Sequence, residues 1–184
     1  MSQIIQRTAC LFSRFTAGGA ALSMLGLFLI IIINSIRRYF FGKSLEFGEQ
    51  LPVFIAIYGV MFGIAWAYMQ DRHIRFTMLV GFLSEQWTWR LYFLVDLVMI
   101  VTGGLLTYSG WLFANKRGGL EASGIISLAR VLKAMTGWDG IIWIGQMYPY
   151  QAAMIAGGIL LTIAAVLRFL TRVSEKPELQ TNTV

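Results

Sequence analysis

Four long stretches of apolar residues constrain this chain more than any other feature. A helix that crosses the hydrocarbon core of a bilayer needs about 20 predominantly apolar residues. The stretches lie at Ala17–Ile36, Leu51–Met69, Leu91–Phe113 and Ala152–Leu170. None of them alternates apolar and polar residues with the period of two that a half-buried strand requires. We therefore predict an all-α integral membrane protein with four transmembrane helices.

The composition agrees with a lipid environment. Of the 184 residues, 57% are hydrophobic and only 13% are charged, whereas about 25% are charged in a soluble domain. A net charge of +6 in a soluble protein would suggest nucleic-acid binding. Here the Lys and Arg residues lie mostly between or beside the apolar stretches, where they suit lipid headgroups. We expect membrane lipids as partners and no nucleic acid.

Two polar-rich ends flank a predicted membrane domain at residues 17–173. Residues 1–16 mix apolar side chains with Arg7 and Arg14, which predicts an amphipathic helix lying in the membrane interface. Residues 174–184 are polar, and we expect a disordered tail there.

The longest connection between spans covers residues 114–149. It is too apolar for a free loop and too short and interrupted for a fifth span, so we predict interfacial or re-entrant structure. Within it, the pattern predicts a short amphipathic helix that Ser123 caps, that runs to Met135, and that Gly137 ends.

The chain offers few residues for catalysis or metal binding. It contains one cysteine, Cys10, and one histidine, His73. These are too few for a zinc site of Cys and His ligands or for a bis-His haem site. No Ser–His–Asp set can be assembled around a single loop histidine, and no phosphate-binding GxxxxGK[ST] loop is present. We expect no enzyme activity, no metal and no cofactor.

Asp96 is the acidic residue inside a predicted span. An intramembrane acid is a candidate proton relay or ion ligand. The structural alternative places Asp96 near the start of its helix, where the helix dipole favours a negative charge and Arg90 lies about 9 Å away along the axis. We favour the structural interpretation, because no other predicted span contains an acid, Lys or His to pass a proton on.

Small residues mark candidate helix-packing faces. Gly59, Gly63 and Ala67 follow one another at intervals of four in the second span, a spacing that lets another backbone approach closely. The pairs Gly103-Gly104 and Gly157-Gly158 add further positions in the third and fourth spans where another helix could approach closely.

Three motifs together resemble the small membrane subunit, DctQ-like, of the tripartite ATP-independent periplasmic (TRAP) transporters. Residues Asn34–Leu45 resemble the family's N-x-x-x-R-Y-x-F-x-x-x-L stretch. Residues Glu46–Leu51 resemble its aromatic-x-Glu-Glu-Leu entrance to the second span, with Gln50 in place of the second Glu. Residues Arg72–Phe76 resemble its x-H-I-R-V-D turn, and Thr77 then stands where the family often has Asp. The resemblance covers roughly residues 17–170.

The resemblance implies a small, non-catalytic subunit of a secondary transporter. In this family a periplasmic binding protein captures the substrate, commonly an organic acid, and a large membrane subunit moves it by sodium-coupled symport. The small subunit packs beside the large one. The family topology places both termini in the cytoplasm of a bacterial inner membrane, with Arg72, His73 and Arg75 in a cytoplasmic turn. The charges alone do not fix this orientation, because the two sides hold eight and seven Lys and Arg residues.

The loops on the expected periplasmic side suggest a docking surface for the binding protein. Their basic, acidic and aromatic residues have the composition of an interface, and lipid-headgroup anchoring is the alternative that stays open. The candidate residues are Arg37, Arg38, Lys43, Glu49, Lys116, Arg117, Arg130, Lys133, Trp138 and Trp143.

Two other functions compete with the subunit hypothesis. One is a self-sufficient channel or exporter that works as a homo-oligomer and uses Asp96 as its coupling acid. The other is a membrane anchor of a redox enzyme, which the single histidine disfavours for a haem site with two His ligands.

Overall fold

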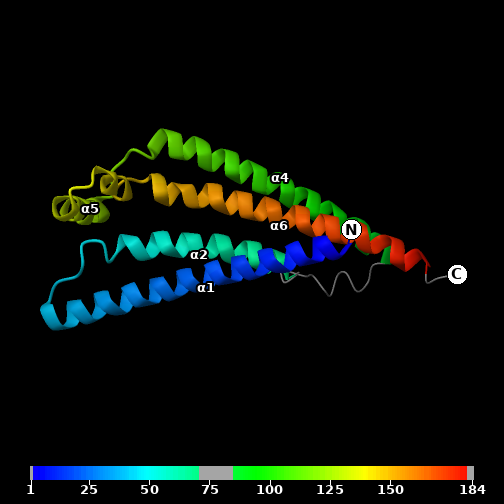
Figure 1. The fold of residues 1–184 in the computed structure, drawn as a ribbon, viewed down its shortest axis with the longest axis horizontal. Coiled ribbons are helices and arrows are strands. Elements are labelled where there is room, and N and C mark those ends of the chain that lie inside the picture. Colours follow the sequence, from blue (N-terminus) through cyan, green and yellow to red (C-terminus); the bar gives the residue numbers. More distant parts are fainter. Residues whose placement is uncertain (1, 71–84, 182–184) are drawn as a thin grey trace.

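The structure, a computed structural model, describes residues 2–70 and 85–181 (Figure 1). Its long helices are α1 (Ser2–Phe41), α2 (Gln50–Met69), α4 (Glu85–Arg117) and α6 (Tyr148–Thr181). A shorter helix, α5 (Ser123–Thr136), and a 3-10 helix, η1 (Asp139–Gly145), connect α4 to α6. In these residues the only strand-like pairing is one isolated bridge between Glu121 and Gln146.

Four helices are long and apolar enough to cross a membrane. Their qualifying parts are Ile5–Phe41, Gln50–Met69, Arg90–Arg117 and Tyr148–Val173. Each contains one of the four predicted spans, so the prediction of an all-α membrane protein with four spans is confirmed. The shorter helices α5 and η1 provide the additional helical segments.

The segments that flank the predicted membrane domain continue long helices. Helix α1 runs without a break from Ser2 to Phe41, and the interfacial position of residues 1–16 stays a prediction. The early turns of α1 already pack on other helices: Thr16 is buried, and the ring of Phe15 lies edge-on to that of Phe62. At the other end, α6 extends to Thr181, and the expected disorder of the tail stays a prediction.

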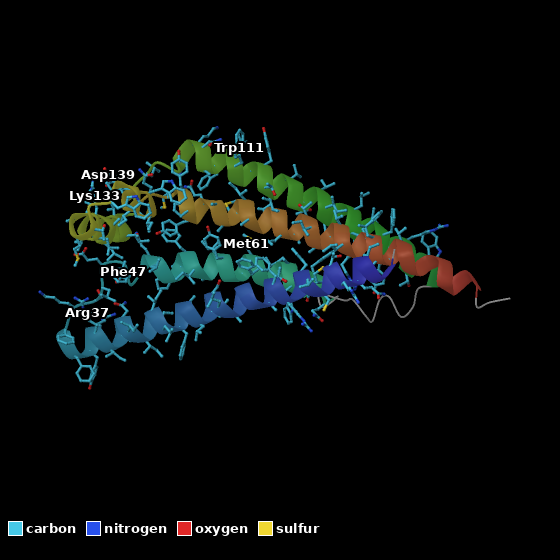
Figure 2. All side chains as sticks on the ribbon, viewed as in Figure 1. Arg37, Phe47, Met61, Trp111, Lys133 and Asp139 are labelled. Carbon is cyan, nitrogen blue, oxygen red and sulfur yellow. The ribbon has the colours of Figure 1, made fainter. Side chains whose placement is uncertain are left out.

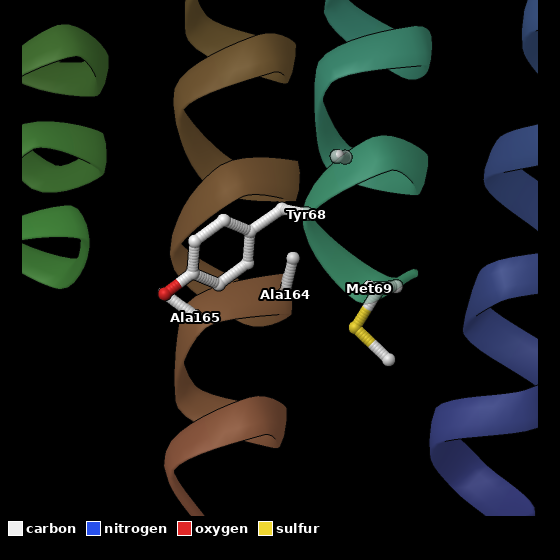
Figure 3. Packing of buried hydrophobic residues seen from close by; sticks show 5 residues of the cluster. Tyr68, Met69, Ala164 and Ala165 are labelled. Atoms are coloured by element: carbon white, nitrogen blue, oxygen red, sulfur yellow. The ribbon is translucent and has the colours of Figure 1, made fainter. Parts of the chain in front are cut away.

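The long helices lie side by side in the order α1, α2, α6, α4 (Figures 1 and 3). Successive helices of the chain run in opposite directions, so the described ends of the chain share one end of the molecule, and α5 and η1 occupy the other (Figure 1). Near the termini α1 also reaches α6. The inner helices α2 and α6 are more buried than the outer helices α1 and α4. The molecule is therefore a single layer of helices with two broad faces.

Small side chains allow the helices of this layer to approach closely. Ala65 of α2 and Ala164 and Ala165 of α6 are fully buried, and they pack with Tyr68 and Met69 of α2 (Figure 3). This cluster lies near the end of the layer that holds the termini. It joins the two helix pairs, α1 with α2 and α4 with α6, into one unit.

The connection after α4 contains the predicted short helix, with one correction at its start. Gly137 ends α5 in the left-handed conformation, with φ of 69°, as predicted. Ser123 does not cap α5, because the N-cap residue is Ala122 and its side chain forms no capping bond. Instead Gln50 of α2 supplies the cap: its Oε1 accepts the backbone N–H of Gly124 at 3.1 Å, and its Nε2 donates to the hydroxyl of Ser123 at 3.0 Å.

Candidate functional site

A buried polar cluster forms around Asp96 at the end of the layer that holds the termini. The Asp96 side chain is 1% exposed. Its Oδ1 accepts a hydrogen bond from the hydroxyl of Tyr68 in α2. Its Oδ2 lies 3.2 Å from Nε of Arg172 in α6, whose guanidinium also stacks on the ring of Tyr92 at 4.4 Å. One carboxylate thus links α2, α4 and α6.

The structural interpretation of Asp96 needs a correction in its details. Helix α4 begins at Glu85, so Asp96 lies three turns inside the helix and beyond the reach of the N-terminal dipole. Arg90 is not its partner, because Arg90 is exposed and lies over the ring of Trp87 at 5.3 Å. The partner is Arg172, which sequence spacing cannot identify because it belongs to another helix. Tyr68 was missed for the same reason.

We call this cluster a clamp, because the contacts of Asp96 with Tyr68 and Arg172 hold α2, α4 and α6 together. A buried carboxylate that pairs with a guanidinium and accepts a hydroxyl hydrogen bond has its charge largely compensated. The interactions that hold Asp96 connect helices that lie on either side of α6 in the layer. The geometry gives no specific support to the channel or exporter hypothesis, in which Asp96 would exchange protons or ions.

The proposed packing face of α2 is used only in part. A Cβ atom on Gly59 would lie 3.0 Å from Cβ of Ser23, so α1 approaches α2 closely at this point. A Cβ on Gly63 would meet nothing within 4 Å, and Ala67 is half-buried. Gly63 and Ala67 therefore remain candidates for contact with a partner outside this chain.

A second site builds up at the opposite end, where α1 ends and α5 lies. Asn34 of α1 accepts the backbone N–H of Leu45 at 2.8 Å and donates to the carbonyl of Gly48 at 3.4 Å. These bonds tie the loop between α1 and α2 to the end of α1. The loop in turn touches α5, where a Cβ on Gly124 would collide with the carbonyl oxygen of Glu46. Asn34 thus holds the loop between α1 and α2 against α1.

The predicted docking residues all lie at this end of the molecule. The exposed cations of α1 and its loop are Arg37, Arg38 and Lys43, and Glu49 follows, also exposed, just before α2. Lys116 and Arg117 are exposed at the end of α4. Trp138 and Trp143 are exposed around η1. Figure 2 shows Arg37, Phe47, Lys133 and Asp139 gathered at this end.

Two of these cations are already paired within the chain. Arg130 contacts both carboxylate oxygens of Glu121, at 3.0 and 3.1 Å. Nζ of Lys133 lies 2.6 Å from Oδ1 of Asp139. The hydrogen bond and the positive charge of Lys133 hold the pKa of Asp139 below its ordinary value. These pairs join α5 to the segments before and after it, so they brace the hairpin of α5 and η1.

Other predicted residues lie outside the two sites. Arg72, His73 and Arg75, the predicted cytoplasmic turn, lie outside the described residues. Within the described part of the chain, no group of three or more His, Cys, Asp and Glu side chains is placed to hold a metal ion.

The chain is similar in sequence to a known protein family. Residues 27–175 match the family described as tripartite ATP-independent periplasmic transporters, DctQ component. The chain belongs to this family. It is therefore a multi-pass membrane protein and a small membrane subunit of the TRAP type, as the sequence motifs predicted.

A curated relative agrees with this assignment to the DctQ family. A Haemophilus influenzae protein, provisionally named a TRAP transporter small permease protein, is 25% identical to the chain over 84 residues. The match covers 46% of this chain and 52% of the relative. The chain thus spans about half the length of this curated relative.

Proposed function

We propose that this DctQ-family chain is a non-catalytic scaffold for the large, ion-coupled subunit of a TRAP transporter that imports an organic acid. The observation that carries the proposal is the single layer of helices. Apolar side chains are exposed along both outer helices, for example Leu22, Leu25 and Leu29 of α1 and Leu97, Val98 and Val101 of α4. A layer of this kind can present a broad apolar face to a larger membrane protein while lipid covers the rest.

The proposal places the end with α5 and η1 in the periplasm and both termini in the cytoplasm of a bacterial inner membrane. The hairpin of α5 and η1 is then the docking element for the binding protein. Its support is the exposure of Trp138, Trp143 and Met135 at the same end of the molecule as the cations of α4, because exposed aromatic, Met and basic residues are typical of interfaces. The ion pairs of Arg130 with Glu121 and of Lys133 with Asp139 connect α5 to the segments before and after it.

The scaffold proposal is tested by purification. The tagged chain is extracted from its native membrane in a mild detergent, and the proteins that accompany it are identified by mass spectrometry. The proposal expects a large multi-span transporter subunit in stoichiometric amount. A reproducible homo-oligomer without such a protein would contradict it and favour the channel or exporter hypothesis.

The docking proposal is tested by charge reversal at the end of α4. Lys116→Glu with Arg117→Glu should lower uptake when the binding protein is limiting and leave it unchanged when the binding protein is saturating. Neither residue forms an ion pair with another described residue, so the change does not break the hairpin. Arg90→Glu is the matched control, because Arg90 is an exposed cation at the opposite end. Unaltered uptake at limiting binding protein would rule out this docking surface.

A further inference from the structure

A recess with charged groups of both signs lies between the end of α1, the following loop and α5. Its volume is about 300 Å³. The polar residues that line it are Arg37, Lys43, Ser44, Glu46 and Ser127, and the apolar ones are Leu45, Phe47, Leu128 and Val131. Figure 2 shows Arg37 and Phe47 on the side of the molecule where α1 and this loop meet. Arg37 and Lys43 are among the predicted docking residues, but the docking proposal above rests on the hairpin of α5 and η1 and on the cations of α4, and it assigns no ligand to this recess.

The walls of the recess are fixed by hydrogen bonds. Asn34 holds the backbone of Leu45 and Gly48, and the N–H of Gly48 also donates to the carbonyl of Leu45 at 2.9 Å. On the opposite side, Gln50 fixes the start of α5 through Gly124. The backbone around the recess is thus in place before a ligand arrives, so binding has to order only the exposed side chains that hold the ligand.

The charged groups of the recess are free to bind a ligand. Arg37, Lys43 and Glu46 form no ion pair with one another or with any other residue in the described part of the chain. Two cations suit a phosphate group, which accepts several hydrogen bonds at once. A carboxylate beside them suits an ammonium group. The hydroxyls of Ser44 and Ser127 add neutral donors.

The apolar surface of α1 leads directly to the recess. Ile33 lies one turn before Arg37 on the same helix face and is exposed, and Ile30 lies almost two turns before it and is half-buried. The aromatic rings of Tyr39, Phe40 and Phe41 are exposed next to Arg37, as expected where a helix leaves the hydrocarbon core. A ligand with a polar head in the recess can therefore place an acyl chain along α1.

We propose that the recess binds the headgroup of a phospholipid with a primary amine, of the phosphatidylethanolamine class. Arg37 and Lys43 hold the phosphate, Glu46 accepts hydrogen bonds from the ammonium group, and the acyl chains follow Ile33 and Ile30. A phosphatidylcholine headgroup carries no N–H to donate to Glu46, and a phosphatidylglycerol headgroup carries no cation. The site therefore discriminates among the three lipid classes.

The test is lipid retention by this chain, together with any subunit that copurifies. The protein is placed in nanodiscs of equal parts palmitoyl-oleoyl phosphatidylethanolamine, phosphatidylcholine and phosphatidylglycerol, and native mass spectrometry identifies the lipids that stay bound. The wild type should retain phosphatidylethanolamine above its share. Arg37→Gln with Lys43→Gln should lower the apparent association constant for phosphatidylethanolamine about 25-fold, about fivefold for each cation, which corresponds to about 1 kcal/mol each. Arg38→Gln is the matched control, because Arg38 is exposed next to Arg37 but does not line the recess.

Glu46→Gln tests the amine separately. This variant should keep a bound phospholipid but lose the preference for phosphatidylethanolamine over phosphatidylcholine. An unchanged preference would overturn the assignment of Glu46 to the ammonium group. A wild-type preference for phosphatidylglycerol would overturn the amine-headgroup class as a whole.

One variant tests the recess without a change of charge, and one comparison distinguishes a bound lipid from a bound side chain of the binding protein. Ser127→Trp fills the recess without removing a charge and should displace the lipid, so the test does not depend on the charge variants alone. Circular dichroism should show unchanged helix content in every variant that is compared. If lipid retention stays at the wild-type level in the double variant while uptake at limiting binding protein falls, the recess serves an acidic side chain of the binding protein, and the lipid proposal fails.

Discussion

At the scale of single residues, the polar side chains of this DctQ-family chain that carry an argument are a buried group that connects helices and exposed groups at the end with α5. Asp96 is the clearest buried case, because its carboxylate contacts Tyr68 and Arg172 from two other helices. Removing one partner of a buried ion pair leaves the other uncompensated, which typically costs roughly 3–5 kcal/mol. Arg172 retains a 19% exposed side chain, which reduces this cost because water reaches it.

Asp96→Asn should therefore destabilise the protein by about 2–3 kcal/mol. Tyr68→Phe should cost less, about 0.6 kcal/mol and at most about 1.7, the range for single hydrogen bonds in membrane proteins. Both values can be measured by equilibrium unfolding in mixed detergent and dodecyl sulfate. Loss of transport in Asp96→Asn without a loss of stability would contradict the clamp and restore Asp96 as a coupling acid.

The pair of Lys133 and Asp139 makes a prediction about pH. The hydrogen bond and charge of Lys133 lower the pKa of Asp139 in the folded state. The pair therefore stabilises the hairpin at pH values above the ordinary Asp pKa of about 3.9, and this contribution is lost as the pH falls through the folded-state pKa. A carboxyl-carbon NMR titration should give Asp139 a lower titration midpoint in the wild type than in the Lys133→Gln variant. Equal midpoints in the two proteins would show that the pair does not form in solution.

At the scale of helices, the contact of α4 with α6 depends on glycines. A Cβ on Gly103 would lie 2.9 Å from the backbone nitrogen of Thr162 and 3.0 Å from the carbonyl oxygen of Gly158. A Cβ on Gly158 would lie 2.8 Å from the carbonyl oxygen of Gly103. The hydroxyls of Thr107 and Thr162 are satisfied by the carbonyls of Gly103 and Gly158 four residues earlier in their own helices. The two backbones thus meet without intervening side chains.

Gly103 and Gly104 offer a matched pair of variants for this contact. Gly103→Ala should destabilise the protein by about 1–3 kcal/mol, because the methyl group forces α4 and α6 apart. Gly104→Ala should be neutral or should stabilise the helix by up to about 1 kcal/mol, since a Cβ there meets nothing within 4 Å. Unfolding titrations of both variants against the wild type provide the measurement. Equal effects would mean that α6 does not lie against Gly103.

At the scale of the whole molecule, the layer determines how the chain can interact. Helix α2 is 20 residues long, about 30 Å, and so matches the hydrocarbon core, whereas α1 with 40 residues is about 60 Å long. The long helices must therefore tilt or extend beyond the membrane. A closed four-helix bundle would hide its apolar residues between the helices. In the layer, the apolar side chains of both broad faces stay exposed and can contact lipid or a partner protein.

Cysteine cross-linking distinguishes the layer from a closed bundle. In a Cys10→Ser background, Ser23→Cys with Gly59→Cys should form a disulfide after a small shift of the helices, because a Cβ on Gly59 would lie 3.0 Å from Cβ of Ser23, slightly closer than the usual Cβ separation of a disulfide. Ser23→Cys with Val101→Cys should not, because α2 and α6 lie between α1 and α4 in the layer. Mobility on non-reducing gels reports both outcomes. Efficient formation of the second disulfide would indicate a bundle instead of a layer.

The four long helices and the end of α5 could be predicted from the sequence, whereas the contacts between helices are visible only in the folded chain. Apolar stretches of spanning length identify the four helices, and Gly137 identifies the end of α5, because hydropathy and backbone conformation are local properties. The partners of Asp96, the capping of α5 by Gln50 and the role of Asn34 could not be read from spacing, since each joins segments that only folding brings together. The order of helices in the layer was equally hidden. It depends on which faces pack closely, and in a membrane hydrophobicity does not distinguish a face that packs on a helix from one that meets lipid.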